Sequence, residues 1–134
     1  MSKEAFISIV DDNESVREAM QGLMKSLGFA AEAFASAEEF LESENRDRAA
    51  CLITDMQMPG LSGLGLHSRL VALGKPVPTI VITAYPDERT RARALQAGVV
   101  SYLVKPFNES DLLACIRSVL RRGDAQRVHD TAPT

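Results

Sequence analysis

Five short apolar runs alternate along the chain with five stretches of helical periodicity, and this alternation restricts the possible folds more than any other feature. Strands that alternate with helices form a parallel sheet, and right-handed crossovers place helices on both of its faces. The predicted fold class is therefore α/β, with a five-stranded parallel sheet. The apolar runs are residues 5–10, 30–34, 51–55, 79–82 and 99–104, and the helical stretches are residues 14–27, 37–43, 63–73, 87–97 and those from 110 onward.

The flavodoxin-like strand order 2-1-3-4-5 is the natural candidate for five such strands. This order places strands 1 and 3 side by side, and ligands of open α/β sheets bind at that switch point, outside the carboxyl ends of the strands. Residues that start and stop helices lie where the pattern requires them. Asn13 is an N-cap, Gly28 ends the helix that follows it, and Ser36 with Glu39 forms a capping box.

The composition is that of one ordinary globular domain. The 134 residues are 46% hydrophobic and 25% charged, which suits a single core. The net charge of −3 argues against nucleic-acid binding, which usually needs a basic surface. Cys51 and Cys115 lie in apolar segments, so we expect core residues in a reducing compartment rather than a disulfide. We find neither an apolar run of the ~20 residues that span a membrane nor a signal peptide, and we expect a cytoplasmic protein without membrane contact.

Polar side chains stand at the ends of several predicted strands. Asp11 and Asp12 follow the first strand, Asp55 ends the third, Thr83 follows the fourth and Lys105 follows the fifth. Parallel strands bring these carboxyl ends to one edge of the sheet, so we expect the side chains to meet there. A simpler role for the central carboxylate is open at this point, since an aspartate before a helix often serves as its N-cap.

Three carboxylates in one pocket repel one another unless a cation compensates their charge. A site made only of oxygen ligands suits Mg²⁺, so we predict a magnesium site at Asp11, Asp12 and Asp55. An anion held between Mg²⁺, the Thr83 hydroxyl and the Lys105 ammonium is most simply a phosphoryl group. Asp55 would be the nucleophile that receives it as an aspartyl phosphate.

Four motifs follow one another along the chain: Val10-Asp11-Asp12, residues 54–60 (Thr-Asp-Met-Gln-Met-Pro-Gly), Ile82-Thr83-Ala84 and residues 102–107 (Tyr-Leu-Val-Lys-Pro-Phe). In this order and at these spacings they resemble the response-regulator receiver domains of two-component signalling. The similarity covers residues 5–121. The segment 36–41, Ser-Ala-Glu-Glu-Phe-Leu, is similar to the FixJ-like branch, whose members usually carry a helix-turn-helix output domain.

The resemblance implies a division of the metal site among four residues. Asp12 and Asp55 would bind Mg²⁺ through their side chains. Gln57 would bind it through its backbone carbonyl, and Asp11 would act mostly through an ordered water. The resemblance thereby adds a backbone ligand to the three carboxylates.

The resemblance also implies how a phosphoryl group on Asp55 is held. Thr83 would bind one phosphoryl oxygen and Lys105 would neutralise another, while the backbone N–H groups of Met56 and Ala84 would hold the rest. The Lys-Pro bond of the family is normally cis, so we expect a cis bond between Lys105 and the proline after it. Its purpose would be to aim the lysine into the pocket.

A switch follows from the same resemblance. Phosphorylation would draw Thr83 inward, and Tyr102 on the fifth strand would turn into the space that it leaves. The alternative for Tyr102 is an ordinary half-buried tyrosine with a satisfied hydroxyl. The responding surface would consist of the fourth helix, the fifth strand and the fifth helix, and it is a possible homodimer interface.

Partners and domain limits complete the prediction. A histidine kinase would donate the phosphoryl group, and the domain would catalyse only its own phosphorylation and dephosphorylation, without turnover of an external substrate. The receiver domain would span residues 1–122, and residues 123–134 would form a flexible tail or the start of a linker. Because nothing in this segment reads bases, any DNA binding would belong to a separate output domain.

Two other functions stay open. A haloacid-dehalogenase-like phosphohydrolase also uses an aspartate at a strand end with Mg²⁺, but it needs a second acid two residues later, where this chain has Gln57. A receiver-like binding module that acts without phosphorylation is the second alternative. The intact set of strand-end residues argues against it without excluding it: Asp11, Asp12, Asp55, Thr83 and Lys105.

Several other polar residues are expected to be ordinary surface. The arginines at 89, 91 and 93 are typical of a solvated helix face, with a self-association or output contact as the alternative. His67, on the helix after the site, is expected to be a surface residue, because the histidine of phosphorelay chemistry belongs to the kinase.

Overall fold

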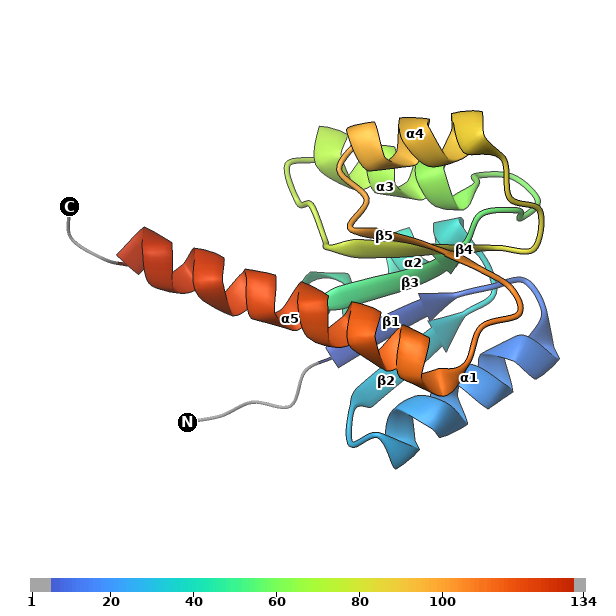
Figure 1. Cartoon of the computed structure of the whole chain (residues 1–134), viewed down its shortest axis with the longest axis horizontal. Helices are drawn as coiled ribbons and strands as arrows, with labels where there is room; N and C mark the ends of the chain where they lie inside the picture. The colour runs from blue at the N-terminus through green and yellow to red at the C-terminus, as the bar shows by residue number, and fades with distance from the viewer. Residues whose placement is uncertain (1–5, 132–134) are drawn as a thin grey trace.

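A computed structural model describes residues 6–131 of the chain, with side chains described as far as residue 121. Its five strands form one parallel sheet in the order β2-β1-β3-β4-β5, which confirms the predicted α/β fold and strand order (Figure 1). Ala5, which we expected to begin the first strand, lies outside the described residues. The strands are β1 (Phe6–Val10), β2 (Ala30–Phe34), β3 (Cys51–Asp55), β4 (Thr79–Thr83) and β5 (Ser101–Val104).

Helices cover both faces of the sheet (Figure 1). Buried side chains of α1 and α5 pack with isoleucines of β1, β3 and β4 on one face. Side chains of α2 and α3 on the other face pack with residues of β1, β2 and β3, and α4 packs beside them against β4. The helices are α1 (Glu14–Ser26), α2 (Ala37–Glu42), α3 (Gly63–Ala72), α4 (Glu88–Gln96) and α5 (Glu109–Thr131), with a short 3₁₀ helix η1 (Arg46–Arg48) before β3.

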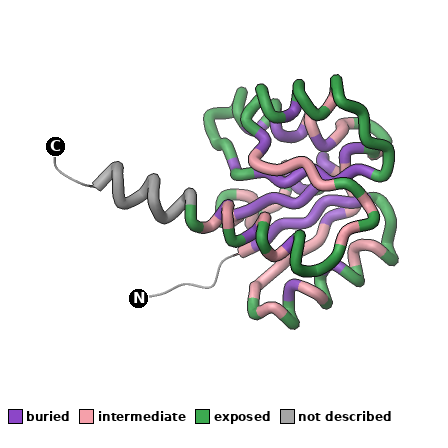
Figure 2. The backbone as a smooth tube through the Cα atoms, viewed as in Figure 1, coloured by how far each residue is buried: buried purple, intermediate pink, exposed green. Residues whose placement is uncertain are grey.

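The central strands are buried on both faces, as their continuous apolar runs predict (Figure 2). Cys51, at the start of β3, is fully buried and reduced, and Cys115 packs against the same cluster. Burial raises the pKa of the Cys51 thiol to about 12. Both cysteines are therefore core residues without a disulfide, as predicted.

The predicted helix signals act as expected, with one difference. The Asn13 side chain accepts a hydrogen bond from the Val16 N–H at 3.1 Å, and Gly28 has a φ of 88°, a conformation that favours glycine. The Ser36 hydroxyl accepts from the Glu39 N–H at 3.0 Å. The Glu39 carboxylate, however, accepts from the Ala35 N–H at 3.2 Å rather than from Ser36. The capping box is thus modified in one respect: the glutamate accepts from the N–H one residue before the N-cap serine.

The last helix is longer than the sequence pattern predicts. We expected a tail without periodic structure from residue 123, but α5 continues to Thr131. Helix propensity explains the difference, because Gly123 is a single break that costs about 1 kcal/mol relative to Ala, and the next proline is Pro133. In Figure 1 this part of α5 extends beyond the sheet. Among the described residues, no helix combines the length and apolar character of a membrane span.

Candidate functional site at the carboxyl edge of the sheet

The strand ends bring the predicted side chains together. Asp55 is the last residue of β3 and Thr83 the last of β4, while Lys105 directly follows β5. The Lys105 Nζ lies 3.6 Å from Asp55 Oδ2 and 3.9 Å from Asp11 Oδ2. The bond between Lys105 and Pro106 is cis, as predicted. Asp11, Asp55 and Lys105 therefore share one site, although they come from three different strand ends. The first and the last of them are 94 positions apart in the sequence (11 to 105).

Three carboxylates form the acidic part of this site. Oxygen atoms of Asp11, Asp12 and Asp55 all lie within 4.8 Å of one another. Asp11 is buried, Asp55 is half-buried and Asp12 is exposed. Burial raises the pKa of Asp11, and the nearby Asp55 and Asp12 charges raise it further, while the Asn13 N–H and Lys105 oppose this shift. Mutual repulsion and hard oxygen donors are what a divalent cation compensates, so these residues fit Mg²⁺.

Thr83 is fully buried and its hydroxyl makes two hydrogen bonds. The Thr83 Oγ1 donates to Gln57 Oε1 at 3.0 Å and accepts from the Tyr85 N–H at 3.0 Å. Gln57 also contacts the carboxylate of Asp55, because its backbone N–H donates to Asp55 Oδ1 at 3.2 Å. Gln57 thus links the Thr83 hydroxyl to Asp55. Ala84, the residue after Thr83, is exposed at the same edge.

The amide predicted to hold a phosphoryl oxygen is occupied in this structure. The Met56 N–H donates to the Ile82 carbonyl at 2.8 Å, so it extends the ladder between β3 and β4. The next amide, that of Gln57, faces the Asp55 carboxylate instead. In this structure the Met56 amide therefore has a backbone partner, and the Gln57 amide is the one that lies beside the Asp55 carboxylate. The sequence gives no signal for this, because the choice depends on how far the ladder continues beyond β3.

Backbone packing explains why the site has this shape. A Cβ on Gly63, the first residue of α3, would lie 2.5 Å from the backbone oxygen of Asp55, so only glycine lets α3 begin this close to β3. Arg17 of α1 donates to the Asp11 carbonyl at 2.9 Å and holds the loop after β1. Glu38 of α2 accepts from the Leu61 N–H at 3.4 Å in the loop after β3. None of these three residues was predicted from the sequence, because each acts on the backbone of another element.

Tyr102 of β5 lies next to this site. Tyr102 pairs in register with Val81, and Val104 pairs with Thr83. Tyr102 therefore lies two residues before Val104, and both side chains are on the same face of the sheet. Its ring packs against the cluster that contains Met56 and Val81. Its hydroxyl is buried and has no hydrogen-bond partner within the described part of the chain. The satisfied hydroxyl of an ordinary half-buried tyrosine is therefore not observed.

His67 is not a surface residue, which corrects the prediction. Its side chain is 4% exposed, and its Cε1 lies 3.5 Å from the position that a Cβ on Gly98 would occupy. Burial lowers the pKa of this imidazole. The surface prediction was wrong because it followed residue type, whereas α3 packs this position against the turn between α4 and β5.

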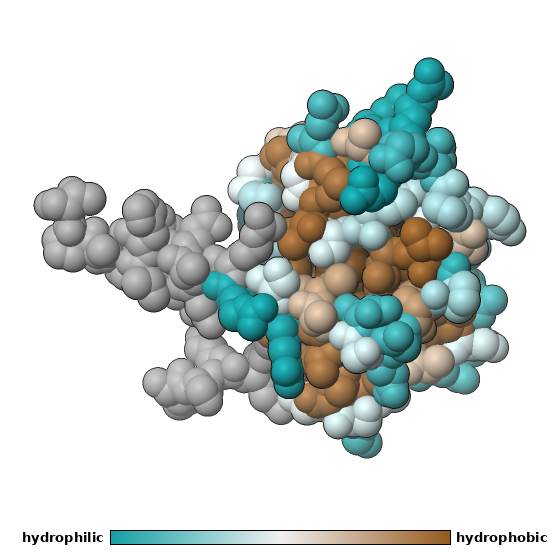
Figure 3. Space-filling model, viewed as in Figure 1, coloured by the Kyte–Doolittle hydropathy of each residue, from teal (hydrophilic) through white to brown (hydrophobic). Residues whose placement is uncertain are grey.

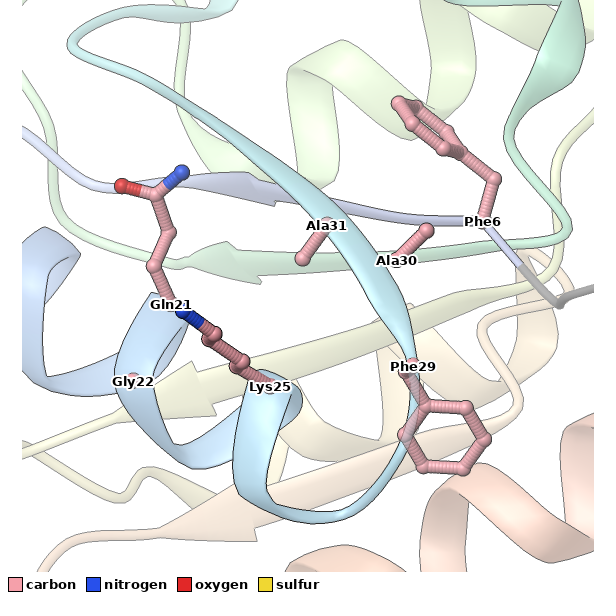
Figure 4. Close-up of a pocket in the computed structure, with 7 residues that line it drawn as sticks. All are labelled: Phe6, Gln21, Gly22, Lys25, Phe29, Ala30 and Ala31. Atoms are coloured by element: carbon pink, nitrogen blue, oxygen red, sulfur yellow. The ribbon is translucent and has the colours of Figure 1, made fainter.

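A hollow at the opposite end of the sheet does not belong to the site. It has a volume of about 510 Å³ and lies where β1 and β2 begin, beside α1 (Figure 4). It is lined by Phe6, Phe29, Gln21 and Lys25 together with glycine and alanine residues, and no carboxylate lines it. The carboxylates of the candidate site lie at the other end of these strands.

The fold and the site define a class of α/β domain with an acidic cluster and a lysine at the switch point of a parallel sheet. The chain belongs to the response regulator receiver domain family, whose model matches residues 7–117. This membership makes it a receiver domain of two-component phosphorelay signalling and favours that function over the phosphohydrolase and over a module that acts without phosphorylation.

Curated proteins similar to this chain include response regulators. The chain is 39% identical over 125 residues to the response regulator protein TodT of Pseudomonas putida, covering 93% of this chain and 55% of TodT. It is 32% identical over 124 residues to the transcriptional regulatory protein FixJ of Bradyrhizobium diazoefficiens, covering 92% of this chain and 60% of FixJ. The chain thus spans a little more than half the length of these relatives.

Solved structures agree with this assignment. The crystal structure of FixJ-N matches with a TM-score of 0.82 and 33% identity, covering 90% of this chain and 96% of that one. The response regulator StyR matches with a TM-score of 0.83 and 38% identity, covering 96% of this chain and 67% of that one. The predicted similarity to the FixJ-like branch is therefore confirmed.

Proposed function

We propose that this domain accepts a phosphoryl group from a histidine kinase on Asp55. An Asp55 carboxylate oxygen attacks the phosphorus, a P–O bond forms, and the P–N bond to the donor imidazole breaks. The observation that carries this proposal is the position of the Lys105 ammonium, 3.6 Å from Asp55 Oδ2, where it can neutralise charge on the incoming group. A small acyl phosphate is an alternative donor by the same chemistry.

The metal would be held by Asp11, Asp12 and Asp55 with the backbone carbonyl of Gln57. Bound Mg²⁺ supplies positive charge to the phosphoryl oxygens during transfer. Asp12 is the most exposed of the three carboxylates, so it is the natural side-chain ligand on the solvent side. Asp11, which is buried and whose Oδ1 accepts from the Asn13 N–H at 2.9 Å, would act mostly through an ordered water.

The phosphoryl oxygens would be bound by the Thr83 hydroxyl, the Lys105 ammonium and two backbone amides. One amide is that of Ala84, which is exposed at this edge. We assign the other to Gln57 rather than to Met56, since the Gln57 N–H already donates to Asp55 Oδ1. All of these groups are donors, which complements a charge that grows on the phosphoryl oxygens.

The response would pass from Thr83 to Tyr102 and then to the face formed by α4, β5 and α5. Leu95 of α4 and Val104 of β5 are 38% and 39% exposed, which gives this face an apolar part. Apolar surface lies between the hydrophilic side chains of α4 and α5 in the space-filling view (Figure 3). This face is the proposed surface for a homodimer or an output contact.

In this proposal residues 1–122 form the receiver domain, and residues 123–134 form a tail or the start of a linker. The longer relatives include proteins named as transcriptional regulators, so DNA binding would belong to a separate output domain. The domain would work in the cytoplasm, where kinase and Mg²⁺ are available. It would catalyse its own phosphorylation and slow hydrolysis, without an external turnover substrate.

The experiment is incubation with acetyl phosphate and Mg²⁺, followed by intact mass measurement. We expect a gain of one phosphoryl group, lost in Asp55→Asn and after removal of Mg²⁺ with a chelator. Asp47→Asn is the matched control, because Asp47 is an exposed aspartate in η1, before β3. Labelling that persists in Asp55→Asn, or its absence from the native chain, would refute the proposal.

A further inference from the structure

Gln57 contacts both the phosphoacceptor and the switch residue. Its backbone N–H donates to Asp55 Oδ1 at 3.2 Å, and its side-chain Oε1 accepts from the Thr83 hydroxyl at 3.0 Å. The side-chain contact joins residues 26 positions apart in sequence. It is therefore a tertiary contact that spans the ends of β3 and β4.

The hydrogen bonds around Thr83 leave its hydroxyl no free donor. A hydroxyl carries one proton, and here that proton points to Gln57 Oε1. The oxygen is fixed from the other side by the Tyr85 N–H at 3.0 Å. Thr83 is fully buried, whereas Gln57 is exposed. Donation to a phosphoryl oxygen on Asp55 thus requires that the bond to Gln57 be broken first.

We propose that the Gln57 side chain is a latch that holds the Thr83 hydroxyl in its resting position and competes with the phosphoryl group for its proton. Gln57 is a positioning residue in this inference, which rests on the proposed function of Asp55. Because Gln57 is exposed, its released amide can bond to water when the phosphoryl group takes the hydroxyl proton. The competition opposes switching by the net strength of one hydrogen bond.

The direct test measures binding of beryllofluoride with Mg²⁺, as a mimic of the phosphoryl group on Asp55, by calorimetry. Gln57→Met keeps the length of the side chain and removes the acceptor, so we expect roughly two- to tenfold tighter binding, the range of one net hydrogen bond. Gln57→Glu keeps an acceptor oxygen and adds negative charge, so its binding should not be tighter than native. Gln21→Met, on the exposed surface of α1, is the control and should match the native chain.

A double-mutant cycle separates the latch from a role in which Gln57 only fills space above the site. In a Thr83→Val background no hydroxyl proton exists, so adding Gln57→Met should leave beryllofluoride affinity unchanged. If Gln57→Met has its full effect in that background, or no effect in the native one, the latch is wrong.

A measurement without phosphoryl donor keeps the latch testable on its own. NMR can measure the rate at which the Thr83 hydroxyl proton exchanges with water. This rate should be higher in Gln57→Met than in the native chain and in Gln21→Met. Equal exchange rates in all three would overturn the latch even if Asp55 is labelled normally. Conversely, failure of Asp55 labelling with acetyl phosphate refutes the proposed function, while faster exchange still supports the latch.

Discussion

At the scale of single residues, the site depends on one ammonium placed between two carboxylates. The Lys105 Nζ lies 3.6 Å and 3.9 Å from oxygens of Asp55 and Asp11. Neither separation is that of a strong hydrogen bond, which for a charged pair is about 2.7–2.9 Å. The lysine is thus close enough to attract both carboxylates electrostatically. Its ammonium group nevertheless stays free to form a hydrogen bond with an incoming anion.

Replacing Lys105 tests this role. We expect Lys105→Met to slow labelling by acetyl phosphate about ten- to a hundredfold, less than the ~10²–10³ of a fully preorganised donor, because the side chain is 30% exposed. The rate is read from intact mass against time. Lys75→Met removes an exposed lysine that pairs with Asp47 and should keep the native rate. A native rate in Lys105→Met would show that the ammonium does not assist transfer.

His67 predicts how stability depends on pH. Burial holds its pKa below the ordinary 6.5, so the unfolded chain takes the proton first. The free energy of unfolding should have its full value above about pH 6.5. As the pH falls below this value, it should decrease by at most ~1.4 kcal/mol per pH unit for one group.

The measurement is urea unfolding at pH 7.5 and 5.5 for the native chain and for His67→Phe, which keeps a ring without the titrating nitrogens. The native chain should lose more stability than the variant between these values. His129 is present in both proteins, so its contribution cancels. An equal loss in both would mean that His67 is protonated as easily in the folded chain as in the unfolded one.

Residue types at strand ends were enough to predict which side chains meet, because parallel topology leaves one edge for them. Details that depend on contact between elements were not predictable in this way. The ladder occupies the Met56 amide and leaves that of Gln57 for Asp55. Likewise, the burial of His67 results from the turn at Gly98, which no local pattern around His67 reveals.

At the scale of elements, Gly63 at the start of α3 is the helical glycine with the least room for a side chain. A Cβ on Gly63 would lie 2.5 Å from the Asp55 backbone oxygen and 3.1 Å from Thr54 Cγ2. By contrast, a Cβ on Gly22, inside α1, would meet nothing within 4 Å. Two glycines in helices thus serve different purposes, and only one of them is required by packing.

The pair Gly63→Ala and Gly22→Ala measures this difference. We expect Gly63→Ala to lower the free energy of unfolding by about 1–3 kcal/mol through overpacking. Gly22→Ala should raise it by about 0.4–1 kcal/mol, because alanine restricts the unfolded chain and fits the helix. Urea unfolding of both variants gives the comparison, and a neutral Gly63→Ala would mean that α3 shifts without cost.

Strand and helix boundaries were predicted to within one or two residues where a cap or a glycine marks them, as at Asn13 and Gly28. The elements without such marks were the ones missed. The 3₁₀ helix at Arg46–Arg48 looks like a polar connection in the sequence, and the C-terminal part of α5 lacks an apolar stripe. Helices are predicted from amphipathic patterns, so a segment whose sequence lacks such a pattern is not found in this way.

At the scale of the whole molecule, the acidic cluster exists only when the chain is folded. Asp11 and Asp55 are 44 residues apart (55 − 11), and the sheet places their oxygens within 4.8 Å. The unfolded chain cannot hold three carboxylates at this spacing, so it should bind a divalent cation weakly. Repulsion among the carboxylates is therefore a cost of folding that a bound cation removes.

Addition of Mg²⁺ should accordingly raise the midpoint of thermal unfolding. At a concentration one hundredfold above Kd, mass action stabilises the folded chain by about 2.7 kcal/mol. This free energy corresponds to a rise of roughly 5–15 °C for a domain of this size. Scanning fluorimetry or calorimetry at constant ionic strength, with NaCl replacing MgCl₂ in the reference, measures the rise. Asp12→Asn removes the exposed carboxylate of the proposed metal site and should lose most of the rise, whereas Asp47→Asn should keep the rise, because Asp47 lies in η1, before β3. A rise of the same size in Asp12→Asn would place the cation elsewhere on the protein.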